Sequence, residues 1–160
     1  MTIKVGDHIP EAKFRVMTAE GPGWKSTGEV FKGKKVVLFA VPGAFTPTCH
    51  KNHLPGFLQN GDAIKAKGVD AIAVTAVNDV FVMNAWGKHG KVGDNILMLA
   101  DGNGEYVKAL GLELNATGFG MGQRGQRFAL IVKDGVATHV NVEAPGEFKV
   151  SAADYVLAQL

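Results

Sequence analysis

The 160-residue sequence contains a single cysteine, Cys49. One cysteine excludes a disulfide within the chain, a Cys-x-x-Cys redox pair and a zinc site built from several cysteines. Basic residues are scattered, with only Lys32, Lys34 and Lys35 close together, and the net charge is +2. The sequence therefore shows no basic stripe for nucleic acid. The thiol itself is either an inert buried group or a reactive one.

Long hydrophobic runs are also missing. The longest, VVLFAV at residues 36–41, is far too short to cross a membrane. The first ten residues, MTIKVGDHIP, lack the apolar core of a secretion signal and the Arg/Ser-rich composition of an organelle-targeting peptide. We therefore expect a cytoplasmic protein. The glycosylation sequon at Asn115 means little without a secretory signal.

The composition is that of an ordinary globular protein, with 46% hydrophobic and 20% charged residues. A chain of this length suits one domain with a sizeable core. It contains no repeat, no low-complexity tract and no obvious linker. We expect residues 1–160 to form a single domain.

Strands alternate with helices along most of the chain. Continuous apolar segments predict buried strands at 34–41, 69–77 and 95–101. Helices are expected between them, the first with a kink or break at Pro55–Gly56 and the second capped by Asn78 or Asp79. This alternation predicts a parallel sheet that is covered on both faces. By contrast, the Gly- and Pro-rich segment at 20–29 is expected to be a surface turn.

The C-terminal part predicts an antiparallel addition to that sheet. A short helix around 105–112 and a glycine-rich stretch come first. Two strands then flank the tight turn at 133–135 and form a hairpin, and a helix capped by Ser151 ends the chain. The expected fold is α/β and thioredoxin-like, with a mixed central sheet, helices on both faces and a C-terminal β-hairpin plus helix.

Cys49 follows the first predicted strand, at the sheet edge where ligands bind in such folds. In the preceding residues, Thr46 is a good N-cap and Pro47 suits the first position of a helix. Cys49 then lies in the first turn, where free backbone N–H groups and the helix dipole favour an anion. The pKa of a thiol in such a place can fall from ~8.5 to ~3.5–7.5. The pattern favours a reactive thiolate over an inert buried cysteine.

A peroxide is a natural target for such a thiolate. Its O–O bond must be aligned with the sulfur, and hydrogen-bond donors are needed where negative charge develops. Thr46 could bind both sulfur and peroxide or simply cap the helix, and Pro42 could shield the thiol or simply end the strand. Arg124 and Arg127, at the start of a core strand, are candidate guanidinium donors or solvated surface residues. Spacing alone leaves these alternatives open.

The stretch PGAFTPTC resembles the P-x-x-x-T-x-x-C signature of the peroxiredoxins, with Pro42, Thr46 and Cys49 in the three places. The longer stretch VPGAFTPTCHKNHLPGF at residues 41–57 resembles the type 5 subfamily. The similarity continues through KGVDAIAVTAVNDVFVMNAWGK, LADGNGEYVKALGLEL and RFALIVKDG, and so covers nearly the whole chain.

The resemblance implies a thiol-dependent peroxidase that reduces hydrogen peroxide and small organic hydroperoxides. Cys49 would be the peroxidatic thiolate and would become a sulfenic acid. Thr46 would orient the peroxide, and Pro42 would shield the product. Arg127, directly before the Phe of the RF strand, would lower the thiol pKa and stabilise the transition state, leaving Arg124 a supporting or surface role. No metal, haem, flavin or selenium cofactor is implied.

The resemblance also bears on partners. Some type 5 members carry a second, resolving cysteine near the C-terminus, but this sequence has Ser151 there and no thiol. An external thiol must then resolve the sulfenic acid through a mixed disulfide, with glutathione plus glutaredoxin favoured and thioredoxin as the alternative. Because the family typically pairs subunits near the active site, we expect a homodimer with Phe45 and Phe119 as candidate contacts.

Two other kinds of function stay open at this stage. Cys49 and His53 are four residues apart on a predicted helix and could form part of a metal-binding module, although two ligands are few. Alternatively, oxidation of Cys49 could control the binding of a partner protein. The G-x-G-x-x-G match at 120–125 precedes a strand instead of opening a helix, so we do not expect a dinucleotide site.

Overall fold

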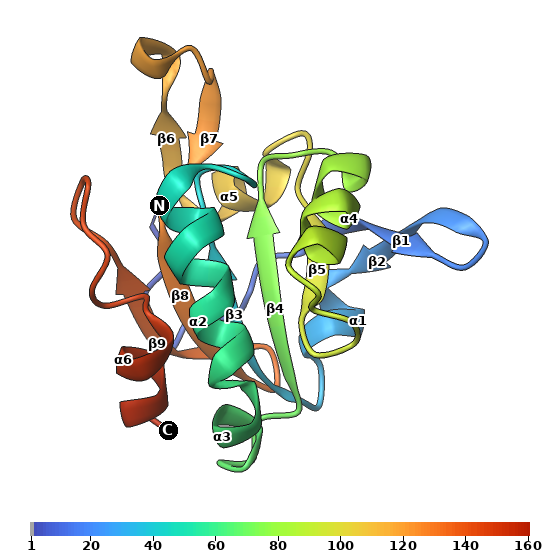
Figure 1. The fold of residues 1–160 in the computed structure, drawn as a ribbon. Coiled ribbons are helices and arrows are strands. Elements are labelled where there is room, and N and C mark those ends of the chain that lie inside the picture. The colour runs from blue at the N-terminus through green and yellow to red at the C-terminus, as the bar shows by residue number, and fades with distance from the viewer. Residues whose placement is uncertain (1) are drawn as a thin grey trace.

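A computed structural model describes residues 2–160 and contains a seven-stranded mixed sheet (Figure 1). The strand order is β2-β1-β5-β4-β3-β8-β9. The three central strands run parallel, and the outer strands run antiparallel to their neighbours. The strands are β1 (Lys13–Thr18), β2 (Gly21–Ser26), β3 (Lys35–Ala40), β4 (Ala71–Ala76), β5 (Leu97–Ala100), β8 (Phe128–Lys133) and β9 (Val136–Val142). The predicted mixed sheet is confirmed.

Helices cover both faces of the sheet, as predicted, because side chains alternate along the strands. On β3, Val37 and Phe39 face one core, and Val36 and Leu38 face the other. The first core packs against α2 (Leu54–Gln59), α3 (Gly61–Lys65), α4 (Val80–His89) and α6 (Ala153–Ala158), and the second against α1 (Thr27–Phe31) and α5 (Glu105–Leu110). Within residues 2–160, no helix is long and apolar enough to cross a membrane.

The expectation of a surface turn at residues 20–29 is wrong. The segment forms strand β2 and the start of α1, with Ser26 and Glu29 in a reciprocal capping box. Strand β2 lies at the edge of the sheet and pairs with β1 on one side only. Pro22 has no N–H, and an edge strand tolerates this because no second strand needs that donor. The proline and glycines of this segment suggested a turn, but they are compatible with the edge strand that forms there.

The C-terminal hairpin agrees with its prediction. Asp134 and Gly135 connect β8 to β9 and both have positive φ, 48° and 77°, as a two-residue type I′ turn requires. The preceding glycine-rich stretch adds a small two-stranded sheet that the sequence pattern did not indicate. It comprises β6 (Glu113–Asn115), the 3-10 turn η2 (Thr117–Phe119) and β7 (Gln123–Gly125).

Candidate active site

The loop after β3 delivers Cys49 to the start of a helix. This helix begins at Pro47, and the N–H of His50 donates to the carbonyl of Thr46 at 2.8 Å. The N–H of Ala44 donates to Asn78 Oδ1 at 2.9 Å, which ties the loop to the end of β4. Cys49 itself is fully buried. The backbone thus has the geometry that the Thr-Pro-Thr-Cys pattern predicts, with Thr46 directly before the first helical residue.

Around Cys49 the helix is wider than an α-helix. Residues Cys49–His53 form a π-helical turn, η1, in which the N–H of Leu54 donates to Cys49 O, five residues earlier. Pro55 has no N–H to donate to Lys51, so the regular α-helical ladder cannot run through this segment. The predicted break at Pro55–Gly56 therefore lies before the proline, while α2 continues through it. Short π segments of this kind often occur at functional sites.

Arg127 joins the thiol to a buried histidine. Its Nη2 donates to Cys49 Sγ at 3.0 Å, and its Nη1 contacts His53 Nδ1 at 2.8 Å. Pairing of β8 with β3 brings it there, because Phe128 lies opposite Ala40 at the point where the cysteine loop begins. The guanidinium keeps its charge and can stabilise a thiolate through a charge-assisted hydrogen bond.

His53 is held as a neutral imidazole with a defined tautomer. Arginine only donates, so Nδ1 of His53 accepts, and Nε2–H donates to the carbonyl of Ser151 at 2.9 Å. Burial, reinforced by the charge of Arg127, lowers the pKa of His53 to about 3. The ring also packs against Phe39 and Phe148. His53 is therefore an acceptor that orients the guanidinium.

Ser151 does not cap the last helix, contrary to the prediction. Helix α6 begins two residues later, at Ala153, and Ser151 instead binds Glu143. Glu143 Oε2 accepts from Ser151 N at 2.8 Å, from Ser151 Oγ at 2.6 Å and from Lys149 N at 2.7 Å. Burial acts to raise the pKa of Glu143, but these hydrogen bonds outweigh it and lower the pKa. The buried carboxylate of Glu143 is thus connected through Ser151 to His53, the partner of Arg127.

The hydroxyl of Thr46 donates to the carbonyl of Gly43 at 2.7 Å. Among the hydrogen bonds of residues 2–160, this hydroxyl accepts none from the helix backbone and none links it to Cys49. Since its proton is used, its lone pairs are left to accept a bond from an incoming O–H. The N–H of Cys49 likewise has no acceptor within the described chain, and can donate to a bound ligand.

A pocket of about 550 Å³ opens beside this site. Arg127, Pro42 and Thr48 form part of its wall, and apolar side chains supply much of the rest. The other lining side chains include Leu114, Phe119, Pro145 and Phe148. Cys49 does not line the pocket itself but contacts Arg127 of its wall, so this pocket is the candidate approach to the sulfur.

Arg124 forms its hydrogen bonds with backbone carbonyls instead of with the thiol. Its Nε donates to Met121 O at 2.9 Å and its Nη1 to Val77 O at 3.1 Å. These bonds tie the turn before β7 to the loop after β4. The structure brings Arg127, not Arg124, into contact with Cys49, which is the distinction that the RF pattern implied.

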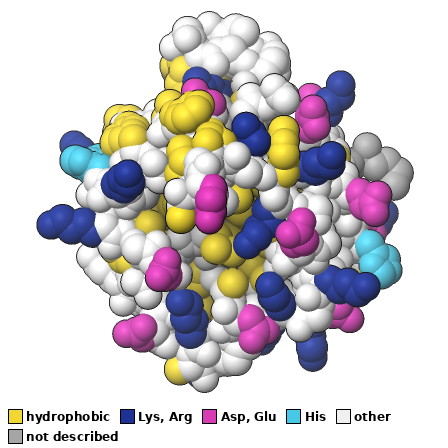
Figure 2. Space-filling view, turned by 90° about the vertical axis from the view of Figure 1, so that its right-hand side faces the viewer, with side chains coloured by type: hydrophobic (Ala, Val, Ile, Leu, Met, Phe, Trp, Pro, Cys, Tyr) yellow, Lys and Arg dark blue, Asp and Glu magenta, His cyan; other side chains and the backbone are white. Residues whose placement is uncertain are grey.

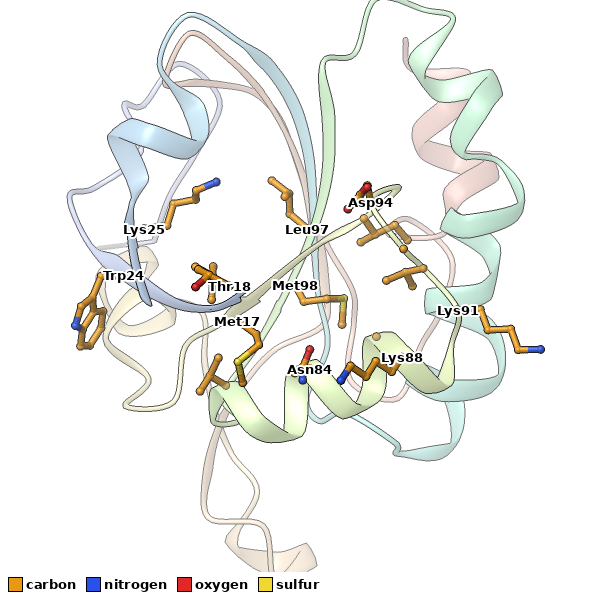
Figure 3. A pocket seen from close by; sticks show the side chains of 16 residues that line it. Met17, Thr18, Trp24, Lys25, Asn84, Lys88, Lys91, Asp94, Leu97 and Met98 are labelled. Atoms are coloured by element: carbon orange, nitrogen blue, oxygen red, sulfur yellow. The ribbon is translucent and has the colours of Figure 1, made fainter. Parts of the chain in front are cut away.

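A larger surface groove, about 740 Å³, lies away from this site. It lies between α4 and β1, where Figure 2 shows hydrophobic side chains gathered in a hollow among charged side chains of both signs. In Figure 3, Met98 lies above Asn84 and Lys88 of α4, Met17 lies to one side of them, and Trp24 is turned outward. None of Cys49, Thr46 or Arg127 lines it. Its size therefore does not make it the active site.

A metal site at Cys49 and His53 does not fit the geometry. The guanidinium of Arg127 binds both the Sγ and the Nδ1 atom that such a metal would need. Within the part of the chain that the structure describes, no three His, Cys, Asp or Glu side chains are grouped to hold an ion. A fixed cation beside the thiol instead suits a site that stabilises negative charge.

Comparison with known proteins identifies the family to which the chain belongs. Residues 4–157 match the model of the Redoxin family. The chain is 46% identical to peroxiredoxin-2B of Arabidopsis thaliana, over 99% of this chain and 98% of that protein. It is 41% identical to the hybrid peroxiredoxin hyPrx5 of Haemophilus influenzae, over the whole chain and 67% of that protein. The chain belongs to the peroxiredoxins.

A solved structure agrees with this assignment. Reduced Prx3 from Vibrio vulnificus, described in complex with H2O2, is 52% identical, with a TM-score of 0.95 and 99% of each chain covered. This peroxiredoxin is accordingly a thiol-dependent peroxidase with a thioredoxin-like fold, as the sequence resemblance implied. The assignment of roles to Cys49, Thr46, Pro42 and Arg127 stays a prediction, which the geometry above supports.

Three residues of this peroxiredoxin site were not among the predicted catalytic residues: His53, Glu143 and Ser151. The i, i+4 spacing from Cys49 was a signal for His53, and it predicts a hydrogen-bonded residue beside the pocket and, as the weaker alternative, a metal ligand. Glu143 and Ser151 carried no useful signal, since their bond to each other lies in an irregular loop and the bond from His53 to Ser151 spans 98 positions.

Proposed function

We propose that this peroxiredoxin reduces hydrogen peroxide and small organic hydroperoxides at Cys49. The observation that carries the proposal is the 3.0 Å contact between Arg127 Nη2 and Cys49 Sγ, in a buried site beside a pocket. A buried thiolate is costly unless a cation and hydrogen bonds compensate it. Arg127 supplies the charge, and the start of the helix supplies backbone N–H groups.

The proposed reaction transfers one oxygen atom to sulfur. The thiolate attacks the nearer peroxide oxygen, the S–O bond forms as the O–O bond breaks, and the bonding pair leaves with the second oxygen. That oxygen takes up a proton and departs as water or an alcohol, while Cys49 becomes the sulfenic acid. Arg127 and the Cys49 N–H are placed to donate where the negative charge is redistributed.

Thr46 and Pro42 have supporting roles in this proposal. Because the hydroxyl of Thr46 already donates to Gly43 O, it accepts the O–H of the peroxide and so fixes which oxygen faces the sulfur. Pro42 adds a wall of the pocket without an N–H of its own, and shields the oxidised sulfur from water. For both residues we therefore propose the active-site role over the purely structural one.

The reductant in the proposal is glutathione with glutaredoxin, and thioredoxin is the alternative. The chain has one cysteine, so an external thiol must form the mixed disulfide with Cys49. Since Cys49 is fully buried beside a pocket of limited size, a small thiol can reach it with less rearrangement than a cysteine on a folded protein. We further propose a cytoplasmic location, where glutathione keeps thiols reduced.

The test is peroxide consumption with the glutathione/glutaredoxin and thioredoxin systems side by side. We expect turnover with the wild type, faster with glutathione and glutaredoxin, and none with Cys49→Ser. Turnover that survives in Cys49→Ser would remove Cys49 from the mechanism. Rapid oxidation of the wild type without turnover by either thiol system would instead favour the redox-gated interaction protein.

We also propose that two copies pair through the exposed aromatic side chains near the active site. Phe45 and Phe119 are 45% and 86% exposed, and Phe81, at the start of α4, is 64% exposed. Phe45 follows β3 in the cysteine loop, and Phe119 lines the pocket beside Arg127. Large apolar side chains in such positions are costly to leave in water and are typical of protein interfaces.

A further inference from the structure

A line of hydrogen bonds leads from the thiol to the interior and ends on one carboxylate. It runs from Cys49 to Arg127, His53, the carbonyl of Ser151 and, through the N–H and hydroxyl of Ser151, to Glu143. The hydrogen bonds along this line are all 3.0 Å or shorter. His53 and Ser151 are fully buried, and Glu143 is 8% exposed.

The carboxylate of Glu143 is directed at the backbone, not at a cation. One oxygen, Oε2, accepts three hydrogen bonds. The donors are the backbone N–H of Lys149, the backbone N–H of Ser151 and the Ser151 hydroxyl. In residues 2–160 the one Lys/Arg–carboxylate ion pair is the exposed pair of Lys149 and Glu147. A buried carboxylate that accepts hydrogen bonds from the backbone in this way fixes the position of the peptide groups it binds, here those of Lys149 and Ser151.

The fixed turn determines the state of His53. With its N–H and hydroxyl held by Glu143, Ser151 presents its carbonyl to His53 Nε2 at 2.9 Å. A carbonyl only accepts, so Nε2 must carry the proton and Nδ1 must be the bare nitrogen. That bare nitrogen is what Arg127 Nη1 needs as a partner, and the planar guanidinium then directs Nη2 at the sulfur.

We propose that Glu143 is a positioning residue for peroxide reduction, acting through Ser151 and His53 on the orientation of Arg127. This inference rests on the proposed function, in which Arg127 assists Cys49. Loss of the Glu143 charge loosens the Ser151 carbonyl, frees His53 to adopt the other tautomer, and turns an N–H toward the guanidinium. Arg127 then shifts from the sulfur, although the backbone bond from Glu143 N to Arg127 O at 3.0 Å is retained.

A double-mutant cycle tests the route. The second-order rate of Cys49 oxidation by H2O2 is measured in single-turnover stopped flow for the wild type, Glu143→Gln, Arg127→Gln and the double variant, with Glu11→Gln as an exposed control. We expect losses of about 10-fold for Glu143→Gln and about 100-fold for Arg127→Gln, since small misplacements in an active site are costly. The double variant should be within about 2-fold of Arg127→Gln, because both changes act on one unit.

A spectroscopic measurement follows the proposed link directly. Nitrogen-15 NMR of the histidine side chains, assigned with His53→Gln, should show the Nε2–H tautomer of His53 in the wild type and in Glu11→Gln. In Glu143→Gln we expect a mixture of tautomers. If that variant does not fold, Ser151→Ala removes the hydroxyl contact alone and should give the same changes, with a rate loss of about 3-fold.

The outcomes separate this inference from the proposed function. An unchanged rate in Arg127→Gln would overturn the role of Arg127 and the inference together. A slow Arg127→Gln combined with multiplicative losses in the double variant would overturn the inference alone. An unchanged His53 tautomer in a slowed Glu143→Gln would do the same, because the effect would then bypass His53.

Discussion

The Nη2 atom of Arg127 lies 3.0 Å from the Sγ atom of Cys49, although 78 positions separate the two residues in the sequence. The antiparallel pairing of β3 with β8 makes this contact, because it places the start of β8 beside the end of β3. Cys49 lies in the helix that follows β3, and Arg127 directly precedes β8, so both residues are held next to the ends of buried strands. An active site built on such strands is held more precisely than one built on loops alone.

The contact leads to a comparison between the two neighbouring arginines. Arg127→Gln removes a charge from the sulfur, and we expect the rate of oxidation by H2O2 to fall about 100-fold. Arg124→Gln removes bonds to the carbonyls of Met121 and Val77, and should mainly lower the free energy of unfolding, by about 1–3 kcal/mol. Stopped-flow oxidation and chemical denaturation of both variants provide the check. Equal rate losses would undo the assignment of Arg127.

The role of the Thr46 hydroxyl can be tested with a substitution that keeps the shape of the side chain. Thr46→Val keeps the branched side chain but loses the bond to Gly43 O and the lone pairs that face the peroxide. We expect a rate about 100-fold lower, whereas Thr46→Ser should retain most of the activity because it keeps the hydroxyl. Peroxidase assays on both variants, with thermal unfolding as a control, measure the difference. A fully active Thr46→Val would leave Thr46 with a structural role only.

The depressed pKa of His53 predicts a pH-dependent stability. An ordinary histidine titrates near pH 6.5, and His53 does so at about 3 in the folded protein. Between these values the unfolded chain binds one more proton than the native state, so stability falls as the pH is lowered, by about 1.4 kcal/mol per pH unit. Above pH 6.5 this contribution is constant, and below about 3 it stops changing.

His53→Gln removes that titration. The variant should be less stable than the wild type at pH 7, because it loses a buried ring and two hydrogen bonds. The gap in free energy of unfolding should then narrow steadily from pH 6.5 to pH 5, since only the wild type has a histidine to protonate on unfolding. Urea denaturation of both proteins at several pH values measures the gap. A gap independent of pH would mean that His53 takes up its proton at the same pH in the folded protein as in the unfolded chain.

Much of this fold follows from local patterns. The apolar runs gave β3, β4, β5 and the hairpin, since a strand buried on both faces has a near-continuous apolar sequence. The same reasoning failed for β2, where Pro22 and the glycines suggested a turn. It also missed the small sheet of β6 and β7, whose three-residue strands have no periodicity to detect.

The site was accessible to sequence reasoning only in part. The helix start at Thr46-Pro47 is a local signal, so the surroundings of Cys49 could be predicted. Ser151 fits a helix cap equally well by local rules, and only the fold shows that its hydroxyl serves Glu143. Contacts between residues far apart in the sequence, such as those of His53 with Ser151 and Arg127, leave no trace in spacing. The bonds of Thr46 to Gly43 and of Glu143 to Ser151 are short-range, but they form in irregular loops that no periodic pattern describes.

The proposed dimer makes a prediction about assembly. The wild type should sediment as a species of twice the 16.9 kDa chain mass. Phe119→Glu places a charge on a side chain that is 86% exposed, and should shift the protein to monomers because a buried unpaired charge is costly in an interface. Tyr155→Glu, on an aromatic residue of α6 that is 45% exposed, is the matched control and should remain dimeric. Sedimentation velocity distinguishes the species, and a wild type that is monomeric at high concentration would contradict the proposal.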